Sequence, residues 1–198
     1  EMYRERTTAF EAFKAGQYLL REEFTSLTWA TQYDFPAVAD GRVKRFELDD
    51  RSPSGAQGWF LNTRRPQLKD GRVREALGLA FDFEWSNKNL FFGSYRRTSS
   101  FFVNSDLEAS GPPAPEERAL LEPWRGKIPD EVFGDPWTAL VSDGSGRDRT
   151  LLKRASDLLA AAGWVRDGGR LVDAADRPFE LEFLESDGSL ARVTGPFV

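Results

Sequence analysis

Residues 58–95 read GWFLNTRRPQLKDGRVREALGLAFDFEWSNKNLFFGSY, and this stretch joins a predicted strand to two predicted helices. The apolar residues over 57–61 predict the strand, which stops before Pro66 because proline has no amide donor for a central ladder. Asp70 precedes apolar residues at helical spacing, so it is the predicted N-cap, whose carboxylate accepts a first-turn amide. Gly93 is the expected end of the second helix. The stretch therefore predicts a strand–helix–helix unit.

The rest of the chain alternates helical and extended patterns. Helices are predicted over 7–16, 29–38 (two short turns divided by a proline), 115–121, 149–163 and 189–198. Strands are predicted over 18–20 and 43–48, with a hairpin of 170–172 and 179–184. Residues 95–149 read as an irregular, loop-rich extension. Interleaved helices and strands predict an α/β or mixed α+β fold, with a mixed sheet flanked by helices.

Composition limits the chemistry that the chain can perform. Its 198 residues are 40% hydrophobic, enough for a proper core, and the net charge is −5 with both signs mixed along the chain, so nucleic acid is not an expected partner. Cysteine and histidine are absent, which removes thiolate metal sites and the commonest metal ligand and general base. Neither a metal nor a cofactor is therefore expected. No apolar run approaches the roughly 20 residues of a membrane helix.

Several stretches carry a family resemblance. The segments NTRRP (62–66), DGRVREAL (70–77) and AFD (80–82) resemble the signature of family-5 extracellular solute-binding proteins, the periplasmic receptors of peptide-importing ABC transporters. The stretches over 81–111 and 119–134 resemble the subgroup linked to oligopeptide and microcin C uptake. The similarity covers nearly the whole chain, while such receptors are normally several times longer. The chain is therefore expected to be a fragment.

The resemblance implies a fold and a function. The implied fold is one lobe of a two-lobed, hinge-closing receptor of the type II periplasmic-binding-protein class, with residues 1–198 forming most of that lobe. The implied function is not enzymatic: a peptide or peptide-like compound is captured between two lobes and delivered to an ABC permease in the membrane. We expect a monomeric periplasmic protein, whose secretory leader would lie upstream of Glu1.

A peptide ligand brings an amine, a carboxylate and backbone polar groups, so charged and aromatic residues at strand ends are the expected contacts. Arg21, Glu22 and Glu23 follow a predicted buried strand, at the edge where ligands of open α/β sheets collect. Their alternative role is a solvated strand end with internal ion pairs. Trp29 and Tyr33 could line a side-chain pocket, or they could belong to the core.

A third candidate group follows the glycine that ends the second central helix. Tyr95, Arg96 and Arg97 are aromatic and cationic, and an arginine can hold a carboxylate by two parallel hydrogen bonds. A surface loop that contacts the other lobe would explain the same residues. All three stay candidates for ligand contact.

Two further arginines have a structural interpretation. Arg64 and Arg65 are expected to satisfy helix ends or to pair with Asp82 or Glu84 rather than to bind ligand.

Two other functions remain open from the residues alone. An interaction module could contact a permease or another partner without holding ligand, through surface loops such as 107–115. A carboxylate-based hydrolase is the weaker alternative, because adjacent residues such as Glu22 and Glu23 point to opposite faces of a strand. The chain also has no GxSxG motif and no phosphate-binding loop of the P-loop type.

Overall fold

The structure is a computed structural model that describes residues 3–185 and 191–197. The chain divides into two compact units, each described separately below. The first unit comprises Glu1–Asp50 and Asn87–Tyr95, and the second comprises Arg51–Ser86 and Arg96–Val198. Among the described residues, no helix combines the length and the apolar character that crossing a membrane requires.

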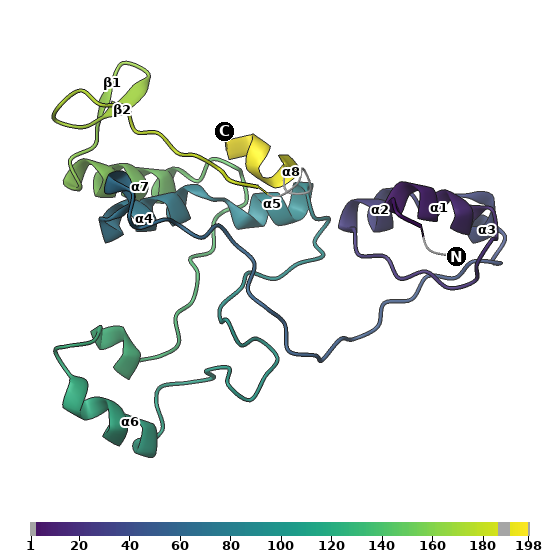
Figure 1. Ribbon diagram of the computed structural model, residues 1–198, viewed down its shortest axis with the longest axis horizontal. Coiled ribbons are helices and arrows are strands. Elements are labelled where there is room, and N and C mark those ends of the chain that lie inside the picture. Colours follow the sequence, from purple (N-terminus) through teal and green to yellow (C-terminus); the bar gives the residue numbers. More distant parts are fainter. Residues whose placement is uncertain (1–2, 186–190, 198) are drawn as a thin grey trace. The chain divides into compact units, whose positions relative to one another are not determined.

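The first unit packs three short helices around an aromatic core. These helices are α1 (Arg6–Lys14), α2 (Ser26–Thr31) and α3 (Pro36–Ala39) (Figure 1). The buried side chains of Phe10, Phe13 and Tyr33 form the core. Partly buried apolar side chains complete it: Tyr18, Trp29, Phe35, Val38 and Val43. Aromatic rings dominate this core, so edge-to-face ring contacts hold the helices together.

The sequence fixes the ends of these helices locally. Helix α1 stops at Gly16, whose φ of 73° is a left-handed conformation that glycine adopts without strain. The amides of Gly16 and Gln17 donate to the carbonyls of Phe13 and Ala12, which closes the last turn of the helix. The chain then turns back along α1.

The second unit is built on a pair of helices, α4 (Gly71–Ala80) and α7 (Arg149–Ala161), which pack side by side (Figure 1). Ala76, Leu79 and Ala155 are buried at the contact, and the two alanines let the helices approach closely. Both helices begin at an aspartate N-cap. Asp70 accepts a hydrogen bond from the Arg72 amide at 2.9 Å, and Asp148 accepts from the amides of Thr150 and Leu151. The expected cap at Asp70 is confirmed.

Helix α5 (Phe83–Asn89) follows α4 directly and spans the boundary between the units. Asp82 precedes α5 and is buried. Its carboxylate accepts hydrogen bonds from the amides of Trp85 and Gly146, both at 2.8 Å. This one side chain therefore starts α5 and ties it to the loop before α7.

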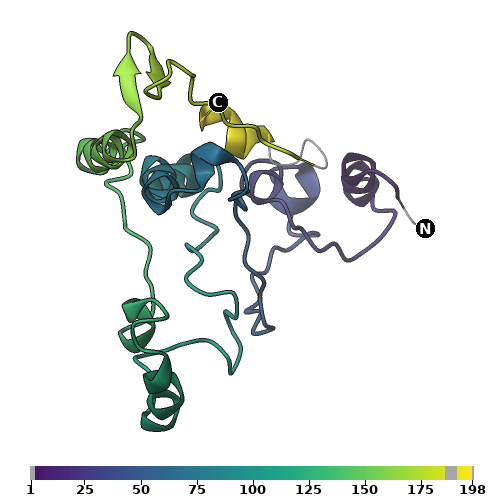
Figure 2. The ribbon, with the colours of Figure 1, turned by 60° about the vertical axis from the view of Figure 1, so that its left-hand side comes forward.

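The remaining elements of the second unit are short. They are η1 (Pro66–Leu68), α6 (Pro115–Leu121), η2 (Glu122–Trp124), η3 (Asp130–Phe133), α8 (Ala191–Thr194) and η5 (Gly195–Phe197). Strands β1 (Val165–Asp167) and β2 (Arg170–Val172) pair antiparallel as a hairpin that follows α7 (Figures 1 and 2). Val165 faces Val172 and Asp167 faces Arg170 in its register.

The predicted helices agree with the structure better than the predicted strands do. Helices over 7–16, 115–121 and 149–163 are present within one to two residues, and the C-terminal helix over 189–198 is present in its described part. The segments 18–20, 43–48, 57–61 and 179–184 were predicted as strands, and they are irregular in the structure. Arg170–Val172 pairs as a hairpin with the preceding residues Val165–Asp167. The predicted pairing with the later segment is present only at its start, where Val172 bridges Pro178 and the Phe179 amide donates to the Leu171 carbonyl at 2.8 Å.

These differences share one physical cause. A strand is stable only beside a neighbour that takes its hydrogen bonds, and among the described residues only β1 and β2 pair over more than a single bridge. Leu20, Leu48 and Leu184 lie in the segments predicted as strands, and their side chains are almost fully exposed. The expected mixed sheet is therefore not formed by the described residues. One two-stranded antiparallel sheet is present in its place.

Candidate functional site

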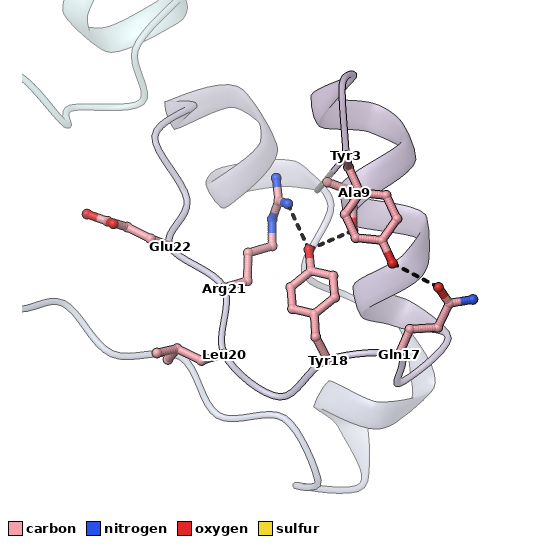
Figure 3. A pocket seen from close by; sticks show the side chains of 7 residues that line it. All are labelled: Tyr3, Ala9, Gln17, Tyr18, Leu20, Arg21 and Glu22. Carbon is pink, nitrogen blue, oxygen red and sulfur yellow. Dashed lines mark hydrogen bonds between the residues drawn. The ribbon is translucent and has the colours of Figure 1, made fainter. Parts of the chain in front are cut away.

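An open cavity of about 750 Å³ lies in the first unit, beside α1 (Figure 3). Its lining combines polar and apolar side chains from the start of the chain, from α1 and from the segment after it. The lining residues are Tyr3, Ala9, Gln17, Tyr18, Leu20, Arg21 and Glu22. Two of the predicted ligand-binding residues, Arg21 and Glu22, thus border one cavity.

Two tyrosines connect the segments that line this cavity. The Tyr18 hydroxyl donates to the carbonyl of Ala9 at 2.6 Å, and the Tyr3 hydroxyl donates to the Gln17 side-chain oxygen at 2.9 Å (Figure 3). The rings of Tyr3 and Tyr18 lie 5.9 Å apart. The returning segment is therefore held by side chains, since it has no strand partner.

Arg21 is bound within the unit. Its Nη1 donates to the Tyr18 hydroxyl at 3.1 Å, while Nε and Nη2 donate to one oxygen of Glu23 at 3.2 and 3.0 Å. The guanidinium also lies over the Phe10 ring, 5.2 Å from its centroid. The second oxygen of Glu23 accepts from the Thr25 amide at the start of α2. The side chains of Arg21 and Glu23 are 11% and 3% exposed, so this is a buried ion pair.

The pKa values of Arg21 and Tyr33 are set by burial and by the ion pair of Arg21 with Glu23. Burial opposes the charge of Arg21, but its hydrogen bonds to Tyr18 and Glu23 outweigh that effect and raise its pKa. Burial raises the pKa of Tyr33, and the negative charge of Glu23 raises it further. Arg21 is therefore cationic and Tyr33 is a neutral phenol at physiological pH.

Glu22 lies differently from its neighbours. Its side chain points away from Arg21 and Tyr18 (Figure 3). It is exposed and has no hydrogen bond or ion pair with another residue of the described chain. Glu22 is thus a carboxylate at the border of the cavity that remains available to an amine.

Trp29 and Tyr33 lie in and beside the core of the first unit. Tyr33 is buried, with its ring 5.2 Å from that of Phe10. Trp29 is half-buried, and its indole nitrogen donates to Glu47 at 3.2 Å. The guanidinium of Arg45 lies 4.0 Å from the Trp29 ring centroid. The residues over 43–48 thus cover Trp29, and a role for either aromatic residue in ligand binding stays a prediction.

The group Tyr95, Arg96 and Arg97 is divided by the boundary between the units. In the first unit, the amide side chain of Asn87 holds the Tyr95 backbone by accepting from its N–H at 3.2 Å and donating to its carbonyl at 2.8 Å. The Tyr95 ring meets the Phe91 ring edge-to-face at 5.0 Å. In the second unit, Arg96 is exposed.

Arg97 is half-buried against two rings of the second unit. Its guanidinium lies 5.1 Å from the Phe81 centroid and 5.5 Å from the Phe83 centroid. Burial lowers the pKa of Arg97, and the negative charge of Glu84 opposes that shift. In the part of the chain that the structure describes, the guanidinium has neither a hydrogen bond nor an ion pair.

Arg64 and Arg65 make structural contacts, but not with the expected partners. Arg64 donates to the Asn62 side chain at 3.1 Å, and Arg65 pairs with Glu182 at 3.1 Å. The prediction of Asp82 or Glu84 as partners was wrong, because Asp82 caps α5 and Glu84 accepts two hydrogen bonds from Ser142.

Comparison with known proteins identifies the chain. The family model described as bacterial extracellular solute-binding proteins, family 5 Middle, matches residues 1–194. The chain belongs to this family. Family 5 is a family of binding proteins and not of enzymes, which confirms the expectation and removes the hydrolase alternative. Family membership also implies the mixed α/β fold of periplasmic binding proteins.

Individual family 5 relatives carry more specific names. A Brucella melitensis protein, named simply as a binding protein, is 44% identical over 93% of this chain. The Agrobacterium fabrum protein "Probable peptide-binding protein YejA" is 38% identical over 96% of the chain. "Peptidoglycan-binding protein YepA" of the same organism is 37% identical over 94%. The chain spans 30%, 31% and 32% of the lengths of these curated relatives, respectively.

Sequence reasoning missed part of the site of this family 5 chain. Tyr3, Gln17 and Tyr18 line the cavity, although Tyr18 was assigned only to a strand. Trp59 meets both Phe81, the ring beside Arg97, and Phe183, and residues so distant in sequence carry no local signal of their contact. The turn at Gly16 was the signal that could have placed Tyr18 against α1.

Proposed function

We propose that this chain forms most of one lobe of a longer periplasmic receptor, which captures peptides or peptide-like compounds and delivers them to an ABC permease. Membership of solute-binding family 5 supports the receptor class. The name of the Agrobacterium YejA protein supports a peptide as the ligand, and the name of YepA supports a peptidoglycan-derived compound. Both ligand types share amines, carboxylates and amide groups. The receptor is proposed to act as a monomer.

The cavity of the first unit is the observation that carries this proposal to particular residues. It offers an uncompensated carboxylate on Glu22 together with the Gln17 amide and the rings of Tyr3 and Tyr18. A carboxylate near hydroxyl and amide groups suits a peptide amine, because charge-assisted hydrogen bonds are the strongest such contacts. Arg21 lines the cavity with the apolar part of its side chain, since Tyr18 and Glu23 already accept its hydrogen bonds.

The test is a calorimetric titration of the intact receptor with a pool of tri- to hexapeptides and, in parallel, with soluble peptidoglycan peptides. We expect micromolar or tighter binding of at least one pool. Glu22→Gln should weaken that binding about tenfold or more, because one charged hydrogen bond is lost. Glu116→Gln, in the exposed first turn of α6, is the matched control and should leave affinity unchanged.

Two results would count against this function. An intact receptor that ignores both pools but binds sugars would remove the proposed ligand class. An intact receptor that binds none of them but associates with a permease would favour an interaction module instead. The isolated 198-residue chain should bind weakly, because one lobe supplies only part of the contacts that must offset the lost freedom of the ligand.

A further inference from the structure

A second place in the molecule combines aromatic surface with an uncompensated cation. The rings of Trp59, Phe81 and Phe183, here named the aromatic shelf, come from three segments that are far apart in sequence. Trp59 meets Phe81 edge-to-face at 4.9 Å and Phe183 at 5.9 Å. Trp59 and Phe183 remain 38% and 37% exposed. Part of the apolar surface of the shelf is therefore accessible to a ligand.

Arg97 stands at the margin of the shelf because it shares Phe81 with Trp59. Ring faces attract the positive charge of a guanidinium but offer no oxygen acceptor. The five N–H donors of Arg97 therefore have no acceptor among residues 3–185 and 191–197. A partly desolvated cation without a hydrogen-bond acceptor is unfavourable, so Arg97 is expected to have an anionic partner.

Three other arginines of the second unit show what such a partner can be. Arg72, Arg125 and Arg177 are exposed, and each still forms a close ion pair with a neighbouring carboxylate. The carboxylate whose charge acts on Arg97 is Glu84, but one of its oxygens accepts from the Ser142 amide at 2.9 Å and from the Ser142 hydroxyl at 2.7 Å. Arg97 is more buried than those arginines and yet lacks such an anion.

We propose that Arg97 binds the terminal carboxylate of a peptide ligand, while the aromatic shelf receives the apolar side chain of the last residue. The planar guanidinium fits a carboxylate with two parallel hydrogen bonds. The adjacent rings exclude water, which strengthens that contact. This inference rests on the proposed function and makes it more specific: it selects peptides with a free carboxyl end and an apolar last side chain.

The test is a cycle of two ligands and two receptors. The tetrapeptide Ala-Ala-Ala-Phe is titrated by calorimetry as the free acid and as its C-terminal amide, against the intact receptor and its Arg97→Gln variant. With the native receptor, amidation should weaken binding about ten- to hundredfold, the effect of losing a charged hydrogen-bonded pair. With Arg97→Gln, acid and amide should bind equally.

Two variants keep the test independent of folding. Arg97→Lys keeps the charge but loses the planar fork, so its amidation penalty should be intermediate. Arg166→Gln changes an exposed arginine of β1 in the same unit and should keep the full penalty. Thermal melting of each variant checks that the receptor remains folded.

The remaining outcomes refute either the role of Arg97 or the proposed function. If the peptide pools bind but the tetrapeptide acid does not, or if the amidation penalty survives in Arg97→Gln, the proposed function stands and the role of Arg97 is refuted. The second result would show that a residue other than Arg97 recognises the terminal carboxylate. If neither pool binds, the proposed function fails first and this inference fails with it.

Discussion

Replacing Glu23 with glutamine should destabilise the first unit by about 3 kcal/mol, because the change leaves Arg21 buried and charged without a counter-ion. Glutamine has nearly the same shape as glutamate and can still accept from the Thr25 amide. The lost charge is therefore what the experiment measures. The figure is the lower end of the range for removing one partner of a buried pair, and the low exposure of both side chains places this pair in that class.

Native-state hydrogen exchange of α1 and α2 in the intact receptor is the suitable assay, because it reports local opening rather than unfolding of the whole protein. A loss of about 3 kcal/mol should accelerate the exchange of protected amides roughly 150-fold. Combining Arg21→Met with Glu23→Gln should recover much of the loss, because no charge then remains buried. Amides of α7 should be unaffected and serve as the internal reference.

The matched control is the exposed pair of Arg42 and Asp40 in the same unit. Arg42→Gln should change exchange very little, because water screens that pair. Equal acceleration by Glu23→Gln and Arg42→Gln would refute the reasoning, since burial would then not determine the effect. An additive double variant would likewise show that Arg21 and Glu23 do not act as a pair.

Three further predictions concern the second unit. The hydrogen bonds from Arg72 lower the pKa of Asp70 from its ordinary value of 3.8 to about 2. The ionised carboxylate therefore stabilises α4 fully above pH 3.8, and this stabilisation is lost as the pH falls toward 2. In an acid titration followed by circular dichroism, Asp70→Asn should abolish the loss of helix in this pH range. Ala155→Leu should overpack the contact of α4 and α7 and cost about 1–3 kcal/mol in denaturant unfolding. Gly146→Ala should lower the melting temperature, because φ is 75° and the new Cβ would lie 3.0 Å from the Trp85 ring.

Controls for these changes come from the same unit. Leu152→Ala, on the exposed side of α7, should have a smaller effect than Ala155→Leu. Gly168→Ala has a similar positive φ but no neighbouring atom near its Cβ, so it isolates the backbone cost from the Trp85 contact. An acid titration unchanged by Asp70→Asn would show that this carboxylate does not control the stability of α4.

Helix ends were predictable because their signals are local. The caps at Asp70, Gly16 and Pro115 each act on residues within four positions, so the chain carries the whole cause in one segment. Strands were predicted less well because alternation along 43–48 or 179–184 says nothing about the neighbour that must take the backbone hydrogen bonds. The same limit applies to Arg65, whose partner Glu182 lies more than a hundred residues away.

The sequence by itself determined the family, the start of α4, the bounds of α1, α6 and α7 to within two residues, and the list of charged residues suited to a peptide ligand, because motifs and caps are properties of neighbouring residues. Tertiary structure decided how those charges are used. It buried Arg21 against Glu23, left Glu22 at the border of a cavity, and placed Arg97 over two rings without an anion. Those differences depend on burial and on distant partners, which fix the cost of leaving a charge unpaired.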